Sequence, residues 1–226
     1  EIDERWLAAF CEGLFALADR HGCELVGGDT TRGPRTICIT VFGEVPESAA
    51  LRRDGAQPDD DLWVSGVLGA AAFAVRERNA GRALAPDDEA SIRLDRPQPR
   101  IELGLALRHL ARSAIDLSDG LLGDLGHIVE RSRVGAEIDW PAVPVDARLR
   151  SLGDGERLRL ALSGGDDYEL LFSAAPENRT AIAAVGARLG LPLARIGRVV
   201  CGSAIRVRDA RGRALPVEAR GFDHFA

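Results

Sequence analysis

Short apolar segments of strand length alternate with segments of helical periodicity over most of the chain, and this alternation restricts the fold. Strand-like segments occupy residues 62–67, 113–117, 135–140, 168–174, 194–200 and 204–209. Helical patterns lie between them at about 69–80, near 87–93, at 100–112, after "DLSDG" (116–120) and at 177–190. Such alternation places helices against the faces of a sheet. We therefore predict an α/β (α+β) fold with mixed sheets flanked by helices.

The first fifth of the chain follows a different pattern. Residues 3–20 have helical spacing with Asp3 as a cap, and "CELVG" (23–27) and "TICITVFGEV" (36–45) have the composition of strands. The next segment, "PESAALRRDGAQPDDD", is polar, charged and broken by proline and glycine, which is typical of a domain boundary. We predict two domains, 1–46 and 47–226. Within the second, 141–155 reads as an irregular connection, and 194–200 and 204–209 as a strand pair around a turn.

The composition excludes several classes of protein. All 29 basic residues are arginine, so no lysine is available for a Schiff base or a P-loop. The net charge of -6 argues against a nucleic-acid partner, and no apolar run is long enough to span a membrane. The four cysteines lack C-x-x-C spacing and lie in apolar patterns, so we predict buried free thiols in a cytoplasmic protein.

Three stretches combine glycines with carboxylates, and we interpret each as an apolar strand followed by small residues and acids. They are "LVGGDTTRGP" (25–34), "AIDLSDGLLGD" (114–124) and "ALSGGDDYELLF" (161–172). Glycine lets a ligand approach the main chain, and acids at strand ends direct oxygen atoms into a shared crevice. Oxygen ligands without nearby histidine or cysteine suit Mg²⁺, which shares its remaining positions with water and substrate phosphates.

Each stretch also has a purely structural interpretation. Asp29 could bond its own backbone in a turn, Ser118 or Asp119 could cap a helix, and "GGDDYEL" could be a simple loop. A cap requires only one such residue, however, and three clusters in one acidic chain favour the metal interpretation. Without lysine, phosphate charge would have to be offset by Mg²⁺ and arginine. Arg32 and Arg53 are candidates for that role, and the alternative is that both are solvated surface residues.

The three motifs, together with "LRRDGAQPDDDLWVSG", "RPQPRI" and the closing "GFDHF", closely resemble bacterial thiamine-monophosphate kinases over essentially the whole chain. That family belongs to a superfamily with aminoimidazole ribonucleotide synthetase and selenophosphate synthetase. The resemblance implies Mg²⁺-assisted transfer of the γ-phosphoryl group of ATP to thiamine monophosphate by a homodimer. It also implies roughly a hundred further residues before residue 1, in keeping with the absence of methionine and with typical domain size. We then expect the tail of an N-terminal domain, a complete C-terminal domain, and an inactive chain when isolated.

The resemblance also implies roles for individual residues. It assigns ATP contacts to Gly28, Asp29, Arg53 and Ser118. It assigns Mg²⁺ to Asp29, Asp116 and Asp119. It assigns the thiamine substrate to Asp166, where many members of the family have glutamate, and to Phe222, whose ring would face the cationic thiazolium. It assigns no catalytic residue, because the acceptor phosphate is already ionised.

Two alternatives remain at this point. The chain could be a sister ATP-dependent synthetase of the same superfamily, or a nucleotide- or Mg²⁺-binding fragment without activity. The "GGDDYEL" and "GFDHF" motifs favour the thiamine enzyme over the sister synthetases.

Overall fold

The computed structural model describes residues 3–82 and 84–217, and the chain divides into two compact units, Glu1–Glu44 and Val45–Ala226. In the first unit, helix α1 (Glu4–Arg20) begins after Asp3, whose side chain accepts a hydrogen bond from the Trp6 amide at 3.1 Å. This is the predicted helix with its predicted cap. None of the described helices is long and apolar enough to cross a bilayer.

Residues 23–45 contain no strand, so the strands predicted at 23–27 and 36–45 are wrong for this structure. The apolar side chains of the segment, such as Ile39, Val41 and Phe42, are exposed. A strand exists only where its backbone groups pair with a neighbour. Among the described residues no other segment pairs with this one.

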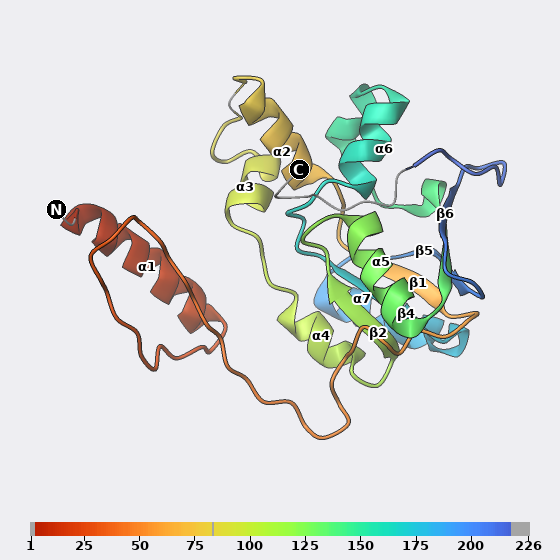
Figure 1. Ribbon diagram of the computed structural model, residues 1–226, viewed down its shortest axis with the longest axis horizontal. Coiled ribbons are helices and arrows are strands. Elements are labelled where there is room, and N and C mark those ends of the chain that lie inside the picture. The colour runs from red at the N-terminus through yellow and green to blue at the C-terminus, as the bar shows by residue number, and fades with distance from the viewer. Residues whose placement is uncertain (1–2, 83, 218–226) are drawn as a thin grey trace. The chain divides into compact units, whose positions relative to one another are not determined.

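The second unit is built on a six-stranded sheet of order β2-β4-β1-β5-β3-β6 (Figure 1). The strands are β1 (Asp61–Ser65), β2 (Ala111–Asp116), β3 (Gly135–Asp139), β4 (Leu170–Ala174), β5 (Leu193–Val200) and β6 (Ile205–Arg208). Neighbouring strands are antiparallel except for the parallel pair β3 and β6. The prediction of a mixed sheet flanked by helices is confirmed.

Helices cover both faces of this sheet. They are α2 (Ala70–Asn79), α3 (Glu89–Asp95), α4 (Ile101–Leu107), α5 (Leu121–Ser132), α6 (Asp154–Leu162) and α7 (Arg179–Leu189). Residues of β1 alternate between the two faces, as the pleat requires. Leu62 and Val64 pack in the core that contains the buried side chains of α5, whereas Trp63 packs with those of α4 and α7. Trp63 also stacks on Phe172 with ring centroids 6.3 Å apart.

Strands β5 and β6 do not pair with each other, so the predicted terminal strand pair is wrong. Strand β3 lies between them. The link 201–204 crosses the start of β3, where the Ala136 amide donates to the Ala204 carbonyl at 3.0 Å. A side chain at Gly135 would approach that carbonyl to 3.0 Å, so glycine leaves room for the crossing. Four extended residues span about 13 Å, enough to pass over one strand.

Two predictions are wrong over the range of helix α6. The irregular connection predicted at 141–155 ends in this helix, and the apolar segment before "SGGDD" belongs to it and is not a strand. Its sequence explains the error, because Leu158, Leu160 and Leu162 stand at alternate positions, which is typical of a strand. In the helix, Leu158 and Leu162 pack with the α5 core, and Leu160 contributes to a separate cluster. The cysteines also differ from prediction. They are free thiols, but Cys23, Cys38 and Cys201 are exposed and Cys11 is partly exposed.

The contact between β3 and β5 requires glycine at position 197. A Cβ atom there would lie 2.0 Å from the carbonyl oxygen of Glu137. We therefore expect Gly197→Ala to lower the free energy of unfolding by about 2 kcal/mol or more, because the strands must separate to admit the methyl group. Gly155→Ala in α6, where nothing lies within 4 Å, is the matched control and should be neutral or mildly stabilising. Urea unfolding followed by circular dichroism measures both, and equal midpoints would contradict the expectation.

Candidate functional site

The pairing of β2 with β4 brings two of the three glycine-carboxylate motifs together. Asp116, at the end of β2, is opposite Leu170, at the start of β4. The loops that extend from these residues are joined by three backbone hydrogen bonds. These are Leu117 N–H to Glu169 O at 2.8 Å, Tyr168 N–H to Leu117 O at 2.8 Å, and Asp166 N–H to Ser118 O at 2.9 Å.

Glycines permit this close approach. A Cβ atom on Gly165 would lie 2.4 Å from the carbonyl oxygen of Ser118. Gly120 has a φ of 106°, and a Cβ atom on it would lie 2.8 Å from the backbone of Ser163. The glycines of "SGGDD" and "DLSDG" are therefore needed for the two loops to meet, whereas the sequence had suggested that they admit a ligand to the main chain.

Neither Ser118 nor Asp119 caps helix α5, so the structural interpretation of this motif is not supported. The N-cap position belongs to Gly120, which makes no side-chain cap bond. Asp124, in the first turn, instead accepts a hydrogen bond from the Asp119 amide at 3.1 Å. Among the described residues, nothing donates a hydrogen bond to the carboxylate of Asp116 or Asp119 or forms an ion pair with it. Both carboxylates are therefore available to a ligand.

Asp124 is a further functional candidate. It lies in the motif "AIDLSDGLLGD", but the sequence alone assigned it no role. Its side chain is buried. Burial raises the pKa of Asp124 to about 6, and the nearby charges of Asp119 and Asp116 act in the same direction. The sequence contained one signal for Asp124, namely an acid in the first turn of the predicted helix, four residues after Gly120. The three carboxylates thus share one strongly negative region.

Two further acids of "GGDDYEL" are buried anchors, which the sequence analysis also missed. Asp167 accepts the Gly69 amide with both carboxylate oxygens, at 2.8 and 3.1 Å, at the start of α2. Glu169 accepts from the Ser65 hydroxyl at 2.6 Å and from Arg93 and Arg100, each at 2.7 Å. These contacts fasten the loop to α2, to β1 and to the segment that carries "RPQPRI".

The groups around Glu169 keep its carboxylate ionised. Burial alone would raise the pKa of Glu169, but hydrogen bonds from Arg100, Ser65 and Arg93 hold it below the ordinary value. Gly66 provides the necessary space, because a Cβ atom there would lie 2.1 Å from Glu169 Oε1. The ionised carboxylate is thus enclosed by two guanidinium groups and a glycine.

The remaining predicted site residues lie elsewhere in the chain. Gly28 and Asp29 belong to the exposed irregular segment of the first unit. Arg53 is exposed, and its carbonyl accepts a hydrogen bond from Ser132 Oγ at 2.9 Å, at the opposite end of α5 from Asp119. Phe222 lies outside the described residues. Within the described part of the chain, no group of three or more His, Cys, Asp or Glu residues is arranged to hold a metal ion.

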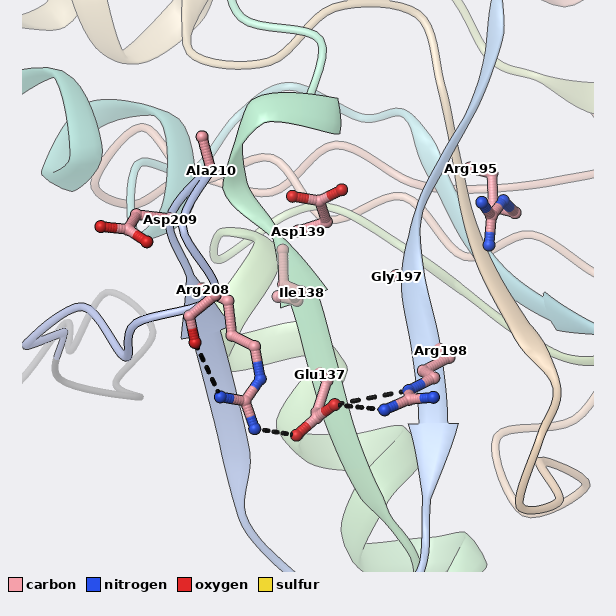
Figure 2. A pocket seen from close by; sticks show the side chains of 10 residues that line it. Glu137, Ile138, Asp139, Arg195, Gly197, Arg198, Arg208, Asp209 and Ala210 are labelled. Carbon is pink, nitrogen blue, oxygen red and sulfur yellow. Dashed lines mark hydrogen bonds and ion pairs between the residues drawn. The ribbon is translucent and has the colours of Figure 1, made fainter.

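A hollow of about 360 Å³ lies at the other end of the sheet, on β3, β5 and β6. Figure 2 shows Glu137 between Arg208 and Arg198, both of which donate to its carboxylate. Three arginines and three acids line this hollow, so its charges balance. Two of its acids, Glu137 and Asp209, are paired with arginines, so it offers no pair of free carboxylates like that in the loops of β2 and β4.

Comparison with known proteins identifies related sequences for both units. The model of the AIR synthase related protein N-terminal domain matches residues 1–45, and that of the C-terminal domain matches 57–210. Thiamine-monophosphate kinase of Salmonella typhimurium is 44% identical over 232 residues, which cover 100% of this chain and 71% of that protein.

Solved structures give the same result. The crystal structure of thiamine-monophosphate kinase from Stenotrophomonas maltophilia K279a is 45% identical, with a TM-score of 0.84, over 95% of this chain and 70% of that one. The structure of AaThiL complexed with AMPPCP and TMP is 25% identical, with a TM-score of 0.77, over 100% of this chain and 70% of that one.

The buried Asp167 makes stability depend on pH. Burial raises its pKa from 3.8 to about 7, so between these values the folded state holds a proton that the unfolded chain releases. The contribution of this group to stability is therefore greatest at low pH and is lost as the pH rises toward 7. We expect Asp167→Asn, which cannot ionise, to become more stable relative to wild type between about pH 4 and pH 7. Urea unfolding across this range measures the difference. Asp139→Asn, at an exposed carboxylate, should track wild type, and a parallel profile for Asp167→Asn would refute the expectation.

Proposed function

The chain belongs to the thiamine-monophosphate kinase family, and we infer that it transfers the γ-phosphoryl group of ATP to thiamine monophosphate, giving thiamine diphosphate and ADP. The identity to curated kinases over the whole chain supports this activity in preference to that of a sister synthetase. The structure complexed with AMPPCP and TMP supports both a nucleotide and a thiamine phosphate as ligands.

One observation carries the placement of the reaction, namely the pair of unpartnered carboxylates at the joined loops of β2 and β4. Asp116 and Asp119 present oxygen ligands and, among the described residues, have no cation of their own. Mg²⁺ is commonly held by one or two carboxylates together with waters and substrate phosphates, so this donor set suits it. Bound there, Mg²⁺ would offset phosphate charge and align the attacking oxygen with the leaving group.

The residues of the chain would bind and orient the two substrates. The acceptor is a phosphate with an ionised oxygen, so no general base is needed, and the main obstacle is repulsion between two polyanions. In this proposal Ser118 contacts ATP between the two metal ligands, and Arg53 reaches the nucleotide phosphates. Gly28 and Asp29 contribute to the same nucleotide, and Asp29 adds a metal ligand.

The thiamine substrate is assigned to Asp166 and Phe222. Asp166 lies in the loop whose backbone is bonded to Ser118, which supports a substrate position next to the nucleotide. Phe222 would supply an aromatic face for the thiazolium cation. We further propose that the enzyme acts as a homodimer in the cytoplasm, as the family resemblance implies.

Substitution of the two carboxylates tests the metal site. We expect Asp116→Asn and Asp119→Asn, each made in the full-length protein, to lower Mg²⁺-dependent formation of thiamine diphosphate by about a hundredfold or more, because each removes a charged metal ligand. Melting temperatures should change little, since neither carboxylate holds the fold together.

Asp154→Asn is the matched control, because Asp154 is an exposed acid that forms an ion pair with Arg157 at 2.7 Å. It should retain wild-type turnover. Near-normal activity of Asp116→Asn and Asp119→Asn at low Mg²⁺ concentration would overturn the assignment.

A further inference from the structure

The loop between α6 and β4 contains two residues with an unfavourable backbone conformation. Asp166 has a φ of 68° and Tyr168 a φ of 48°, in the left-handed region that favours glycine. Side chains other than glycine persist there only where the surrounding structure holds them, and such positions cluster at functional sites. Two of them in one short loop call for a specific restraint.

The restraint is supplied by the residues that alternate with them. Asp167 and Glu169 point inward and are fixed by Gly69 and by Arg93, Arg100 and Ser65, respectively. The amides of Asp166 and Tyr168 are fixed to the Ser118 and Leu117 carbonyls. With both neighbours anchored inside, the side chains of Asp166 and Tyr168 are left outside the anchored core.

Tyr168 is placed for contact with a ligand and does not belong to the core. Its side chain is 39% exposed, and it is in neither large hydrophobic cluster of the described structure. Its hydroxyl lies 3.4 Å from Asp166 Oδ1. Partial burial and the charge of Asp166 raise the pKa of the Tyr168 hydroxyl, as do the charges of Asp116 and Asp119, so the phenol remains a neutral donor. The ring therefore stands among the carboxylates of the site.

We propose that Tyr168 is a substrate-contact residue whose ring forms a wall of the thiamine-phosphate site beside Asp166. Thiamine monophosphate carries a positively charged thiazolium and a flat pyrimidine, and an aromatic face attracts the first and stacks on the second. The Asp166 carboxylate beside the ring favours a cation over the triphosphate of ATP at this position. The proposal rests on the proposed function, and in particular on the assignment of Asp166 to the thiamine substrate.

Removal of the ring tests the contact. We expect Tyr168→Ala to raise the KM for thiamine monophosphate and the Kd measured by calorimetry about threefold to thirtyfold, with the KM for ATP unchanged. Tyr168→Phe keeps the ring and should stay within about twofold of wild type. Leu105→Ala, which removes a side chain of 50% exposure from α4, is the matched control and should leave all constants unchanged.

A second variant separates loss of contact from loss of fold. Glycine accepts the left-handed conformation, so Tyr168→Gly removes the ring and relieves the backbone strain together. It should bind thiamine monophosphate as weakly as Tyr168→Ala while melting no lower than that variant. A wild-type KM for thiamine monophosphate in Tyr168→Gly would overturn the proposal, and so would an equal loss of ATP affinity or a Tyr168→Phe variant as weak as Tyr168→Ala. Failure of the full-length wild-type protein to form thiamine diphosphate would instead refute the proposed function.

Discussion

The antiparallel pairing of β2 with β4 is the constraint on which the site depends. In such a pair the end of one strand lies beside the start of the other, so the loop after Asp116 and the loop before Leu170 emerge at the same edge. The acids expected at strand ends thus lie at the end of β2 and in the loop before β4, at one edge of an antiparallel pair. Three backbone hydrogen bonds and the close approach at Gly165 then join the loops into one rigid surface. A change in the register of this pair would separate Asp116 and Asp119 from the loop that carries Asp166.

The stretch "GGDDYEL" divides its polar residues between two tasks. Asp167 and Glu169 are buried and bonded, whereas Asp166 and Tyr168 lie outside the anchored core, where we propose that they contact the substrate. A buried charge costs free energy unless it is paired, and removing one partner of a buried pair is strongly destabilising. The two arginines on Glu169 are therefore part of the apparatus that holds Asp166 and Tyr168 in place. The cost of the left-handed backbone is offset by contacts made elsewhere in the loop.

Local patterns in the sequence predicted most of this architecture, and the failures have definite causes. The short apolar run of β1 and the helical spacing of α5 gave correct elements, because each pattern lies within a single strand or helix. Leucines at alternate positions made the sequence of α6 resemble a strand. The apolar segment 23–45 has the composition of strands, but no described segment pairs with its backbone. Strand β6 pairs with β3 because the link 201–204 crosses β3 next to Gly135, where a side chain would crowd the Ala204 carbonyl. No local sequence pattern reveals this crossing. The motifs located Asp116 and Asp119, but the anchors of Asp167 and Glu169 lie 98 and 104 residues away, at Gly69 and Ser65, beyond the reach of spacing arguments.

The exclusive use of arginine has a consequence for how the site handles phosphate. Guanidinium groups form planar two-point pairs with carboxylates, as Arg100 does with Glu169 and Arg179 with Asp61. In these pairs the arginines hold loops and strand ends in place. Their N–H groups donate to carboxylates of the protein itself. Of the guanidinium groups nearest the substrate loop, those of Arg93 and Arg100 are bound to Glu169 and so are already engaged. In the proposed reaction, neutralisation of the two polyanionic substrates would therefore fall to metal ions held by Asp116 and Asp119, with Arg53, whose side chain forms no ion pair within the described residues, as the additional cation. A site that leaves its acids unpaired and commits its neighbouring cations to structure would then bind phosphate chiefly through a metal.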